Sequence, residues 1–479
     1  MEEEDVARVG SDYESEKGRR PLYRTQSSME RDSYFPSDSD LDLSFTSYTS
    51  TASTDRTFAS SSARSSLSAA VEFPIRVSLD GPPRRPPRHR GSDPHWSAVA
   101  AAASVSPDGV LRLHHLKLLR RLGSGNLGRV FHCRLKGFDG DFALKVVDRD
   151  AVSGKKLAQA RTEAGVLALL DHPFLPTLYA QLEVSHYSCL LIDYCARGDL
   201  HSLMRARPGN RLPLAAARFY AAEVLLALEY LHCKGIVYRD LKPENVLVRA
   251  DGHVMLSDFD LCFQADVVAA VEKAETAAPP PGSSDCDCFG RRRRKTVEET
   301  TEVVVEPRGA YSRSCVGTHE YLAPEVVDGG GHGSGVDWWA FGVFLYEMLY
   351  GRTPFRGASK EATLRNIHTK GLGFPGAGDG EEEGMAEARD LIGRLLVKDP
   401  RKRLGCDNGA PEIKRHPFLA GVNWPLIRCY TPPGTRTSSS RDVRVGGIDG
   451  KTRPRWSLRR LWHFGNKKHD QVLNGRKWL

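Results

Sequence analysis

Residues 238–245 read YRDLKPEN. They place Asp240, Lys242 and Asn245 at fixed offsets in a loop, and Asp258 follows the next pair of strands within the string DFD. Phosphoryl transfer needs a carboxylate that orients the attacking hydroxyl, a cation beside the moving group, and an amide with a second carboxylate to hold Mg2+. We therefore expect Asp240 to orient the hydroxyl and Lys242 to stabilise the γ-phosphoryl group. Asn245 and Asp258 are the expected magnesium ligands.

A glycine-rich loop lies upstream, where residues 122–130 read LGSGNLGRV. Glycine leaves room for backbone to close over phosphates, although the same spacing occurs in dinucleotide-binding folds and in ordinary turns. Here the loop lies between two expected strands and Lys145 lies on the next one, which argues against the strand-to-helix context of the dinucleotide folds. The residues expected to bind the nucleotide are Leu122, Gly123, Ser124, Gly125, Asn126, Leu127, Gly128, Arg129, Val130, Lys145, Asp193 and Cys195.

Lys145 and Glu163 form the remaining part of the predicted catalytic set. Lys145 follows Ala-Leu in a strand-like run, and Glu163 lies in a segment with helical periodicity. We expect Lys145 to hold the α- and β-phosphates and to pair with Glu163. The alternative is a surface lysine and a solvated glutamate.

The pattern of apolar residues predicts an α+β fold. Short apolar runs bounded by turn residues indicate strands at 118–122, 129–133, 142–147 and 189–194. Helical periodicity indicates helices at 157–170 and 214–232. The expected architecture is bilobal, with a small β-rich lobe followed by a larger helical lobe.

Composition limits the possible environments. The chain has 479 residues, 40% of them hydrophobic, and a formal net charge of +8 that is concentrated in a few basic runs. No motif that reads nucleic acid accompanies this charge. The acidic N-terminus has no apolar signal segment, and no apolar run approaches the ~20 residues that span a bilayer. The ten cysteines lack disulfide spacing, which suits a reducing cytoplasm.

Residues 116–418 resemble the eukaryotic protein kinase family. Besides the stretches above, the resemblance rests on GTHEYLAPE at 317–325, DWWAFG at 337–342 and DPRKRLG at 399–405. The EYLAPE and WWAFG forms are similar to those of the AGC group. The resemblance implies an ATP- and Mg2+-dependent serine/threonine kinase.

The same resemblance implies further residue roles. Glu325 would form a structural ion pair with Arg403. Ser314 would be the activation-segment phosphosite, and its phosphate, with a charge of about −1.5 to −2, would pair with Arg239. Carboxylates that meet substrate arginines two or three residues before the target serine would be Asp199 and Glu244.

Two features narrow the resemblance to a plant-specific AGC subgroup, namely Asp260 in place of a glycine and a long insertion before Ser314. The strings DLDLSF at 40–45 and TDRTFASSSARSSL at 54–67 resemble the WAG branch of the PINOID-like kinases. This branch implies phosphorylation of PIN-type auxin efflux carriers and regulation of polar auxin transport. An upstream phosphoinositide-dependent kinase is a further partner that the family suggests.

The expected domain organisation has three parts. Residues 1–113 are rich in Ser, Thr, Pro and Arg and are predicted to be a disordered tail. The kinase domain is expected at 116–418 and holds an inserted loop at 261–313. Residues 419–479 would be a divergent AGC-type C-terminal tail: a docking tail, a membrane-surface segment, or the product of an aberrant gene model.

The insertion leaves several interpretations open. Its basic run at 291–295, RRRRK, could contact anionic lipid at about 1 kcal/mol per residue, act as a nuclear localisation patch, or be a solvated charge run. We favour lipid contact, and hence a cytoplasmic protein that is peripheral at the plasma membrane, with a nuclear pool as the alternative. Cys286 and Cys288 beside it could be acylated or could bind metal.

Two other functions are compatible with parts of the sequence. A pseudokinase is suggested by Asp260, but metal binding belongs to Asp258, and aspartate tolerates left-handed backbone better than most residues. A membrane-surface adaptor would use the basic insertion alone. The complete set of catalytic residues favours an active enzyme over both.

Overall fold

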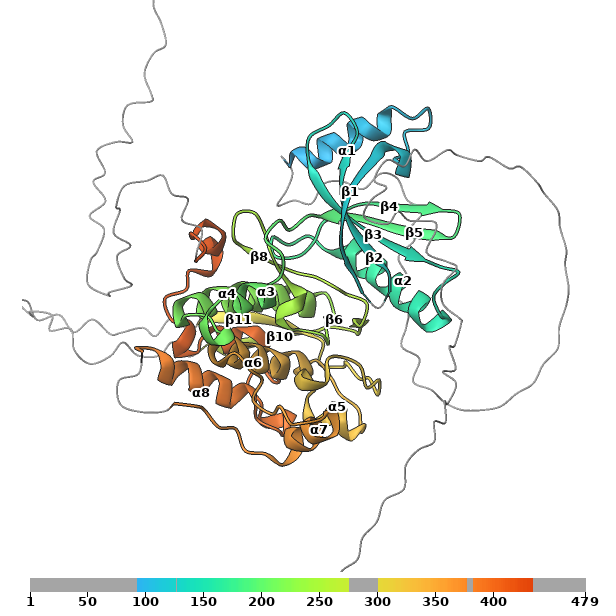
Figure 1. The fold of residues 1–479 in the computed structure, drawn as a ribbon. Coiled ribbons are helices and arrows are strands. Elements are labelled where there is room, and N and C mark those ends of the chain that lie inside the picture. Colours follow the sequence, from blue (N-terminus) through green and yellow to red (C-terminus); the bar gives the residue numbers. More distant parts are fainter. Residues whose placement is uncertain (1–92, 126, 275–299, 377–381, 434–479) are drawn as a thin grey trace, which may run out of the picture. The chain divides into compact units, whose positions relative to one another are not determined.

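A computed structural model describes residues 93–125, 127–274, 300–376 and 382–433. Its first part is a five-stranded antiparallel sheet, and a largely helical region follows it (Figure 1). The predicted fold class is thereby confirmed. The strand order is β1-β2-β3-β5-β4. The strands are β1 (Leu116–Ser124), β2 (Arg129–Leu135), β3 (Asp141–Asp148), β4 (Leu178–Val184) and β5 (Tyr187–Asp193).

The two faces of this sheet have different roles. Because side chains alternate along a strand, Phe131 and Leu144 lie on one face, and their neighbours Val130 and Lys145 lie on the other. The first face is buried in a core cluster that includes Phe142. The second face therefore presents Lys145 to helix α2 (Gly154–Leu169) and to the helical region.

Helix α1 (Pro94–Ser104) packs on the first face. Asp93 caps its N-terminus by accepting a hydrogen bond from the His95 backbone N–H, and Val99 and Ala102 are buried among the sheet residues. The Trp96 ring lies 5.2 Å from that of Tyr179. The sequence analysis placed these residues in the N-terminal tail, so the structure differs here: the alanine-rich stretch is a capped helix with a buried face.

The helical region is built around α6, which is apolar on nearly all sides and buried almost throughout, as expected for a central helix. The predicted helix at 214–232 is α4. The helices are α3 (Leu200–Arg205), α4 (Leu214–Cys233), α5 (Pro324–Asp328), α6 (Gly335–Tyr350), α7 (Lys360–Thr369), α8 (Met385–Leu395) and α9 (Gly409–Lys414).

Short antiparallel strand pairs hold the loops that carry the predicted site. Strand β6 (Ile236–Val237) pairs with β9 (Phe263–Gln264), and β7 (Val246–Val248) pairs with β8 (Val254–Leu256). The loop with Asp240 thus begins at β6 and ends at β7, while Asp258 follows β8.

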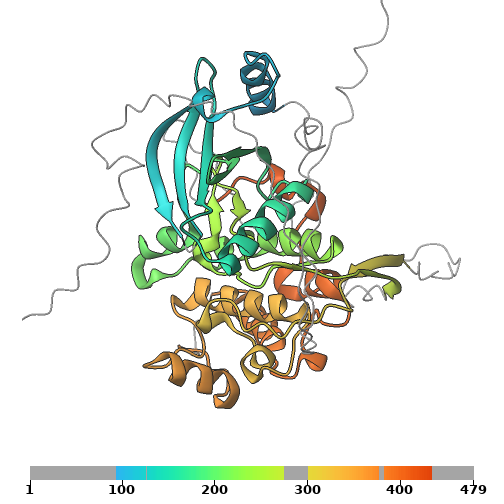
Figure 2. The same ribbon diagram turned by 90° about the vertical axis from the view of Figure 1, so that its right-hand side faces the viewer.

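The inserted loop begins and ends in a two-stranded ribbon. Strand β10 (Val268–Ala274) pairs with β11 (Thr300–Glu306) in an antiparallel register that runs from Val268 opposite Glu306 to Ala274 opposite Thr300. Figure 2 shows the two strands side by side, extending away from the helices. The basic run at 291–295 and both Cys286 and Cys288 lie outside the described residues, as do residues 1–92 and 434–479.

Past residue 418 the chain stays packed on the helical region. Ile427 is buried in the large core, and Arg428 lies over the Phe174 ring, 5.9 Å from its centroid, and contacts Asp251 at 3.2 Å. Among the residues that the structure describes, no helix combines the length and the apolar character that a membrane span requires.

Candidate active site

The glycine-rich loop joins β1 to β2. The Gly125 backbone N–H donates to the Gly128 carbonyl oxygen, 2.9 Å away, which closes the turn. A Cβ at Gly128 would collide with the Val146 carbonyl oxygen, so only glycine allows the loop to approach β3 this closely. Of the other predicted loop residues, Leu122, Gly123 and Ser124 end β1, and Arg129 and Val130 begin β2. Leu127 is buried, and Asn126 lies outside the described residues.

Lys145 connects the sheet to the helical region. Its Nζ lies 2.6 Å from Glu163 Oε1 on α2 and 2.9 Å from Asp258 Oδ1. Burial alone would lower the pKa of Lys145, but the charges of Glu163 and Asp258 outweigh it and raise the pKa above its usual value. The amine therefore stays a cation on the strand that the glycine loop approaches, as phosphate binding requires.

The end of β5 and the segment after it hold the two other predicted nucleotide-binding residues, Asp193 and Cys195. The carboxylate of Asp193 accepts hydrogen bonds from the Thr177 backbone N–H at 2.7 Å and the Tyr179 hydroxyl at 3.2 Å. The nucleotide-binding role of Asp193 stays a prediction, because a carboxylate that accepts two hydrogen bonds has further acceptor sites. Cys195 is half-buried, with its Sγ 3.8 Å from Met255 Sδ.

Asp240 lies at the centre of a buried hydrogen-bond network. Lys242 Nζ donates to its Oδ2 at 2.6 Å, and Asn245 Nδ2 donates to the same oxygen at 3.0 Å. Its Oδ1 accepts from the backbone N–H and the hydroxyl of Thr318, at 3.1 and 2.9 Å. Lys242 also reaches the Thr318 hydroxyl at 2.9 Å. The carboxylate is thus held in one orientation before any substrate arrives.

Left-handed backbone occurs at two positions beside the catalytic carboxylates, Arg239 (φ 69°) and Asp258 (φ 61°). Such backbone is strained for residues other than glycine and is often found at functional sites. Asp260, for which the sequence analysis considered this conformation, is not among the residues with positive φ. It is buried, and burial together with the charge of Asp258 raises its pKa to about 7.

The predicted magnesium ligands fit the ion chemically. Mg2+ prefers carboxylate and amide oxygens and usually binds one or two carboxylates together with substrate phosphates. The Asp258 side chain is 42% exposed, so its carboxylate is open to the cleft while one oxygen contacts Lys145. Asn245 uses Nδ2 for both of its bonds to Asp240, which leaves the amide oxygen as the atom that could bind a cation.

One of the two predicted substrate-binding carboxylates, Glu244, lies near two others for which the sequence predicts no role. Glu244 is half exposed. Burial is the main cause that raises the pKa of Glu347, and the charge of Glu244 raises that pKa further. Glu320 adds to the same effect. Glu347 accepts a hydrogen bond from the Tyr321 hydroxyl. Three carboxylates from separate segments therefore share a negative region.

Asp199 is also occupied in a local structure. It is the N-cap of α3, and its Oδ1 accepts from the Ser202 backbone N–H at 2.6 Å. The prediction that it binds a substrate arginine is not excluded by this bond, because a carboxylate has further acceptor sites.

The activation segment brings Arg239 to Ser312. The Arg239 guanidinium donates to the Ser312 hydroxyl at 3.0 Å and lies over the Phe263 ring. The Ser314 backbone N–H donates to the same hydroxyl at 3.1 Å, so Ser312 connects Arg239 with the predicted phosphosite. Ser312 is 1% exposed and Ser314 is half-buried, which makes Ser314 the more accessible of the two.

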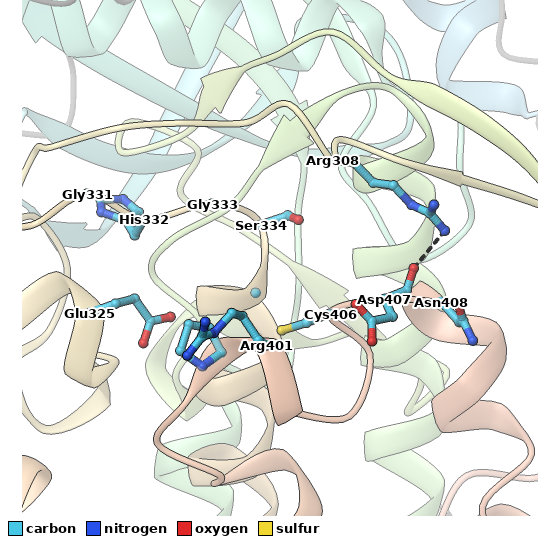
Figure 3. A pocket seen from close by; sticks show the side chains of 12 residues that line it. Arg308, Glu325, Gly331, His332, Gly333, Ser334, Arg401, Cys406, Asp407 and Asn408 are labelled. Carbon is cyan, nitrogen blue, oxygen red and sulfur yellow. Dashed lines mark hydrogen bonds between the residues drawn. The ribbon is translucent and has the colours of Figure 1, made fainter.

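The expected ion pair between Glu325 and Arg403 is present. Two bonds of 2.7 and 2.8 Å join the guanidinium to the carboxylate in the bidentate arrangement. Glu325 also lines a pocket of about 600 Å³ between the loop before α6 and residues 400–408 (Figure 3).

Comparison with known proteins agrees with this geometry. Residues 116–276 and 297–419 match the protein kinase domain family, and the chain belongs to this family. It is 57% identical over 441 residues to the serine/threonine-protein kinase WAG2 of Arabidopsis thaliana, which covers 89% of this chain and 88% of the relative.

Two further relatives place the chain more closely. The serine/threonine-protein kinase WAG1 of Arabidopsis thaliana is 55% identical over 465 residues, 93% of this chain and 96% of the relative. The protein kinase PINOID of Oryza sativa subsp. japonica is 47% identical over 426 residues, 85% of this chain and 87% of the relative. The chain is thus a serine/threonine protein kinase of the WAG/PINOID group of plant AGC kinases, which confirms the resemblance read from its motifs.

Proposed function

We propose that this kinase transfers the γ-phosphate of ATP to a serine or threonine hydroxyl through Asp240 and Lys242. The observation that carries the proposal is the fixed Asp240 carboxylate, bound by Lys242, Asn245 and Thr318. A preorganised acceptor of this kind orients the attacking hydroxyl and receives its hydrogen bond. Lys242 then stabilises negative charge on the moving phosphoryl group. Thr318, for which the sequence predicts no role, contacts both the Asp240 carboxylate and the Lys242 amine.

Lys145, Glu163 and the glycine loop are proposed to bind ATP. Lys145 would hold the α- and β-phosphates, and Glu163 would fix its position. Asn245 and Asp258 would hold Mg2+, and this ion would neutralise phosphate charge. The protein kinase domain implies use of both ATP and Mg2+.

The acidic region supports a preference for basic substrates. After burial, the charges of Glu244 and Glu320 raise the pKa of Glu347, and all three carboxylates raise the pKa of Tyr321. A substrate arginine would relieve this repulsion, and each charge-assisted hydrogen bond contributes roughly 1.5–3 kcal/mol. Asp199 would meet a second arginine.

A peptide assay tests this proposal. Replacing the arginines two and three residues before the target serine with alanine should lower kcat/KM more than tenfold. Glu244→Gln should remove much of this difference between the two peptides, whereas Glu387→Gln, on exposed α8 surface, should preserve it. Faster phosphorylation of acidic peptides would contradict the proposal.

We further propose that the physiological substrates are PIN-type auxin efflux carriers and that the kinase regulates polar auxin transport. Similarity to the WAG and PINOID kinases is the support for this. The cytosolic loop of such a carrier, added to the same assay, should be phosphorylated by the wild type. A loop that is phosphorylated no better than its arginine-free version would oppose the assignment.

Regulation is proposed to act on Ser314. Ser314 is half-buried and its backbone N–H donates to the Ser312 hydroxyl, which contacts Arg239. A phosphate at Ser314 would add about −1.5 to −2 charge and order the segment through Arg239. An upstream phosphoinositide-dependent kinase is the proposed modifying enzyme.

A further inference from the structure

A buried cluster of charged side chains contacts the start of the loop that carries Asp240. His232, at the end of α4, has Nδ1 2.9 Å from Glu306 Oε2 and Nε2 2.9 Å from Asp337 Oδ2. The three residues are 0%, 3% and 0% exposed, respectively. Burying charges is costly unless each is paired, so this cluster is stable only as a complete set.

Asp337 connects the cluster to the catalytic loop. Its Oδ2 accepts from the Tyr238 backbone N–H and its Oδ1 from the Arg239 backbone N–H, each at 2.8 Å. Arg239 has the left-handed backbone (φ 69°) and directly precedes Asp240. The carboxylate of Asp337 therefore holds the strained backbone that orients Asp240.

His232 can serve both carboxylates only as an imidazolium. A neutral ring has one N–H, whereas each of its nitrogens here faces a carboxylate oxygen, and only the charged ring donates from both. Burial lowers the pKa of His232, but Glu306, followed by Asp337, outweighs burial and raises it to about 10. The hydrogen bond from His232 to Asp337 is thus charge-assisted. Glu306 maintains this state because its charge favours the protonated ring.

Glu306 belongs to the inserted loop, because it is the last residue of β11. Its carboxylate occupies the space that a side chain at Gly409 would need, and Gly409 has positive φ (59°), which favours glycine. Two residues later, Arg308 donates to the Asp407 carbonyl oxygen at 2.7 Å, at the edge of the pocket in Figure 3. The returning end of the insertion is therefore fixed to the helical region.

We propose that Glu306 is a positioning residue for phosphoryl transfer: the returning strand of the insertion supplies the carboxylate that holds His232 as a charged donor to Asp337, and so fixes the backbone before Asp240. This role rests on the proposed catalytic function of Asp240. Through Glu306, the β11 end of the insertion would help to position the loop that carries Asp240.

The test compares Glu306→Gln, which removes the charge at nearly constant shape, with Glu306→Asp, which keeps it. In the full-length Glu306→Gln protein, kcat on a peptide should fall roughly tenfold, since a charge-assisted bond is about twice as strong as a neutral one. The KM for ATP should change little, because the glycine loop and Lys145 are untouched. The Glu306→Asp protein should keep most of the wild-type kcat, because it retains the carboxylate charge.

The pH profile separates positioning from simple destabilisation. In the wild type, the pKa of His232 of about 10 keeps the ring charged to pH 9, so this group adds no pH dependence between pH 6 and 9. Without Glu306 the pKa of His232 should fall, because burial lowers it and only Asp337 still raises it, so kcat should decline as pH rises from 6 to 9. Among the described residues, the charged groups that act on this region from neighbouring elements include Arg239, Glu229 and Lys414. The thiols of Cys233 and Cys262 lie near the cluster as well. Burial raises the pKa of both, to about 11 for Cys233, so they stay neutral in this range.

A readout without turnover keeps this inference separate from the proposed function. Hydrogen exchange at the amides of Tyr238 and Arg239 should be at least several-fold faster in Glu306→Gln and near wild type in Glu306→Asp. A matched control, Glu412→Gln, removes a carboxylate from neighbouring α9 and should leave both amides and the pH profile unchanged. Unchanged exchange and a flat pH profile in Glu306→Gln would overturn the inference. An inactive wild type would instead oppose the proposed function.

Discussion

Asp258 combines a strained backbone with an open carboxylate. Its φ of 61° is left-handed, its side chain is 42% exposed, and it contacts Lys145 at 2.9 Å. Asparagine tolerates left-handed backbone about as well as aspartate. Asp258→Asn should therefore preserve the fold and remove only the anionic metal ligand.

We expect kcat of Asp258→Asn to fall at least about 100-fold, the usual loss when one preorganised electrostatic group is removed. The melting temperature should change by no more than a few degrees. Peptide phosphorylation measured beside thermal unfolding checks both, with Asp139→Asn in the exposed β2–β3 turn as the control. Turnover within a few-fold of the wild type would remove Asp258 from the proposed mechanism.

At the same scale, sequence reasoning found the residues that are close in the chain. Asp240, Lys242 and Asn245 form one short motif, so their types and spacing suffice to predict their juxtaposition. Thr318 lies 78 residues from Asp240, and Asp337 lies 105 residues from His232. Both belong to motifs that are evident in the sequence, but only the fold shows that Thr318 contacts Asp240 and that Asp337 contacts His232 and the backbone before Asp240.

Among the elements, α1 was missed for a physical reason. Its alanines read as part of a low-complexity tail, yet alanine has the highest helix propensity, and Asp93 with Pro94 is a favourable helix start. What stabilises α1 is tertiary: Val99 and Ala102 cover the sheet face opposite Lys145. The β10–β11 ribbon was missed likewise, because its pairing partner lies beyond the undescribed part of the insertion.

Removing α1 should destabilise the small lobe. A chain that starts at Asp93 should unfold like the full-length protein, whereas one that starts at Ser106 should lose roughly 2–4 kcal/mol of unfolding free energy, from burial of about 25 cal/mol per Å2. Asp93→Ala should lose about 1 kcal/mol through the cap. Urea unfolding of the full-length protein, the two truncated chains and Asp93→Ala measures this order. Equal stability of the two truncated chains would show that α1 contributes nothing to the sheet.

For the whole molecule, the insertion divides into a paired base, β10 and β11, and residues 275–299 between them, which lie outside the described residues. The family match stops at residue 276 and resumes at 297, and the structure pairs β10 with β11 on either side of this gap. The basic run at 291–295 lies within the gap. Its charge is therefore attached to the catalytic domain through a ribbon whose last residue, Glu306, contacts His232.

This division predicts that membrane binding and catalysis separate by mutation. As a hypothesis, the basic run holds the kinase at the cytosolic face of the plasma membrane, where each Lys or Arg contributes about 1 kcal/mol near anionic lipid. Neutralising residues 291–295 with glutamine should reduce sedimentation with anionic liposomes at least tenfold, while turnover of a soluble peptide stays near wild type. Ser314→Ala should do the reverse, because Arg239 would lose its proposed anionic partner.

Liposome sedimentation at two salt concentrations, run beside the peptide assay, measures both effects. The wild type should bind less at higher salt, since screening weakens interactions between exposed charges. Neutral liposomes serve as the control for contact that does not depend on charge. Sedimentation of the neutralised variant at the wild-type level would mean that the run is a solvated charge segment. Nuclear retention lost together with these charges, at unchanged liposome binding, would favour a localisation patch instead.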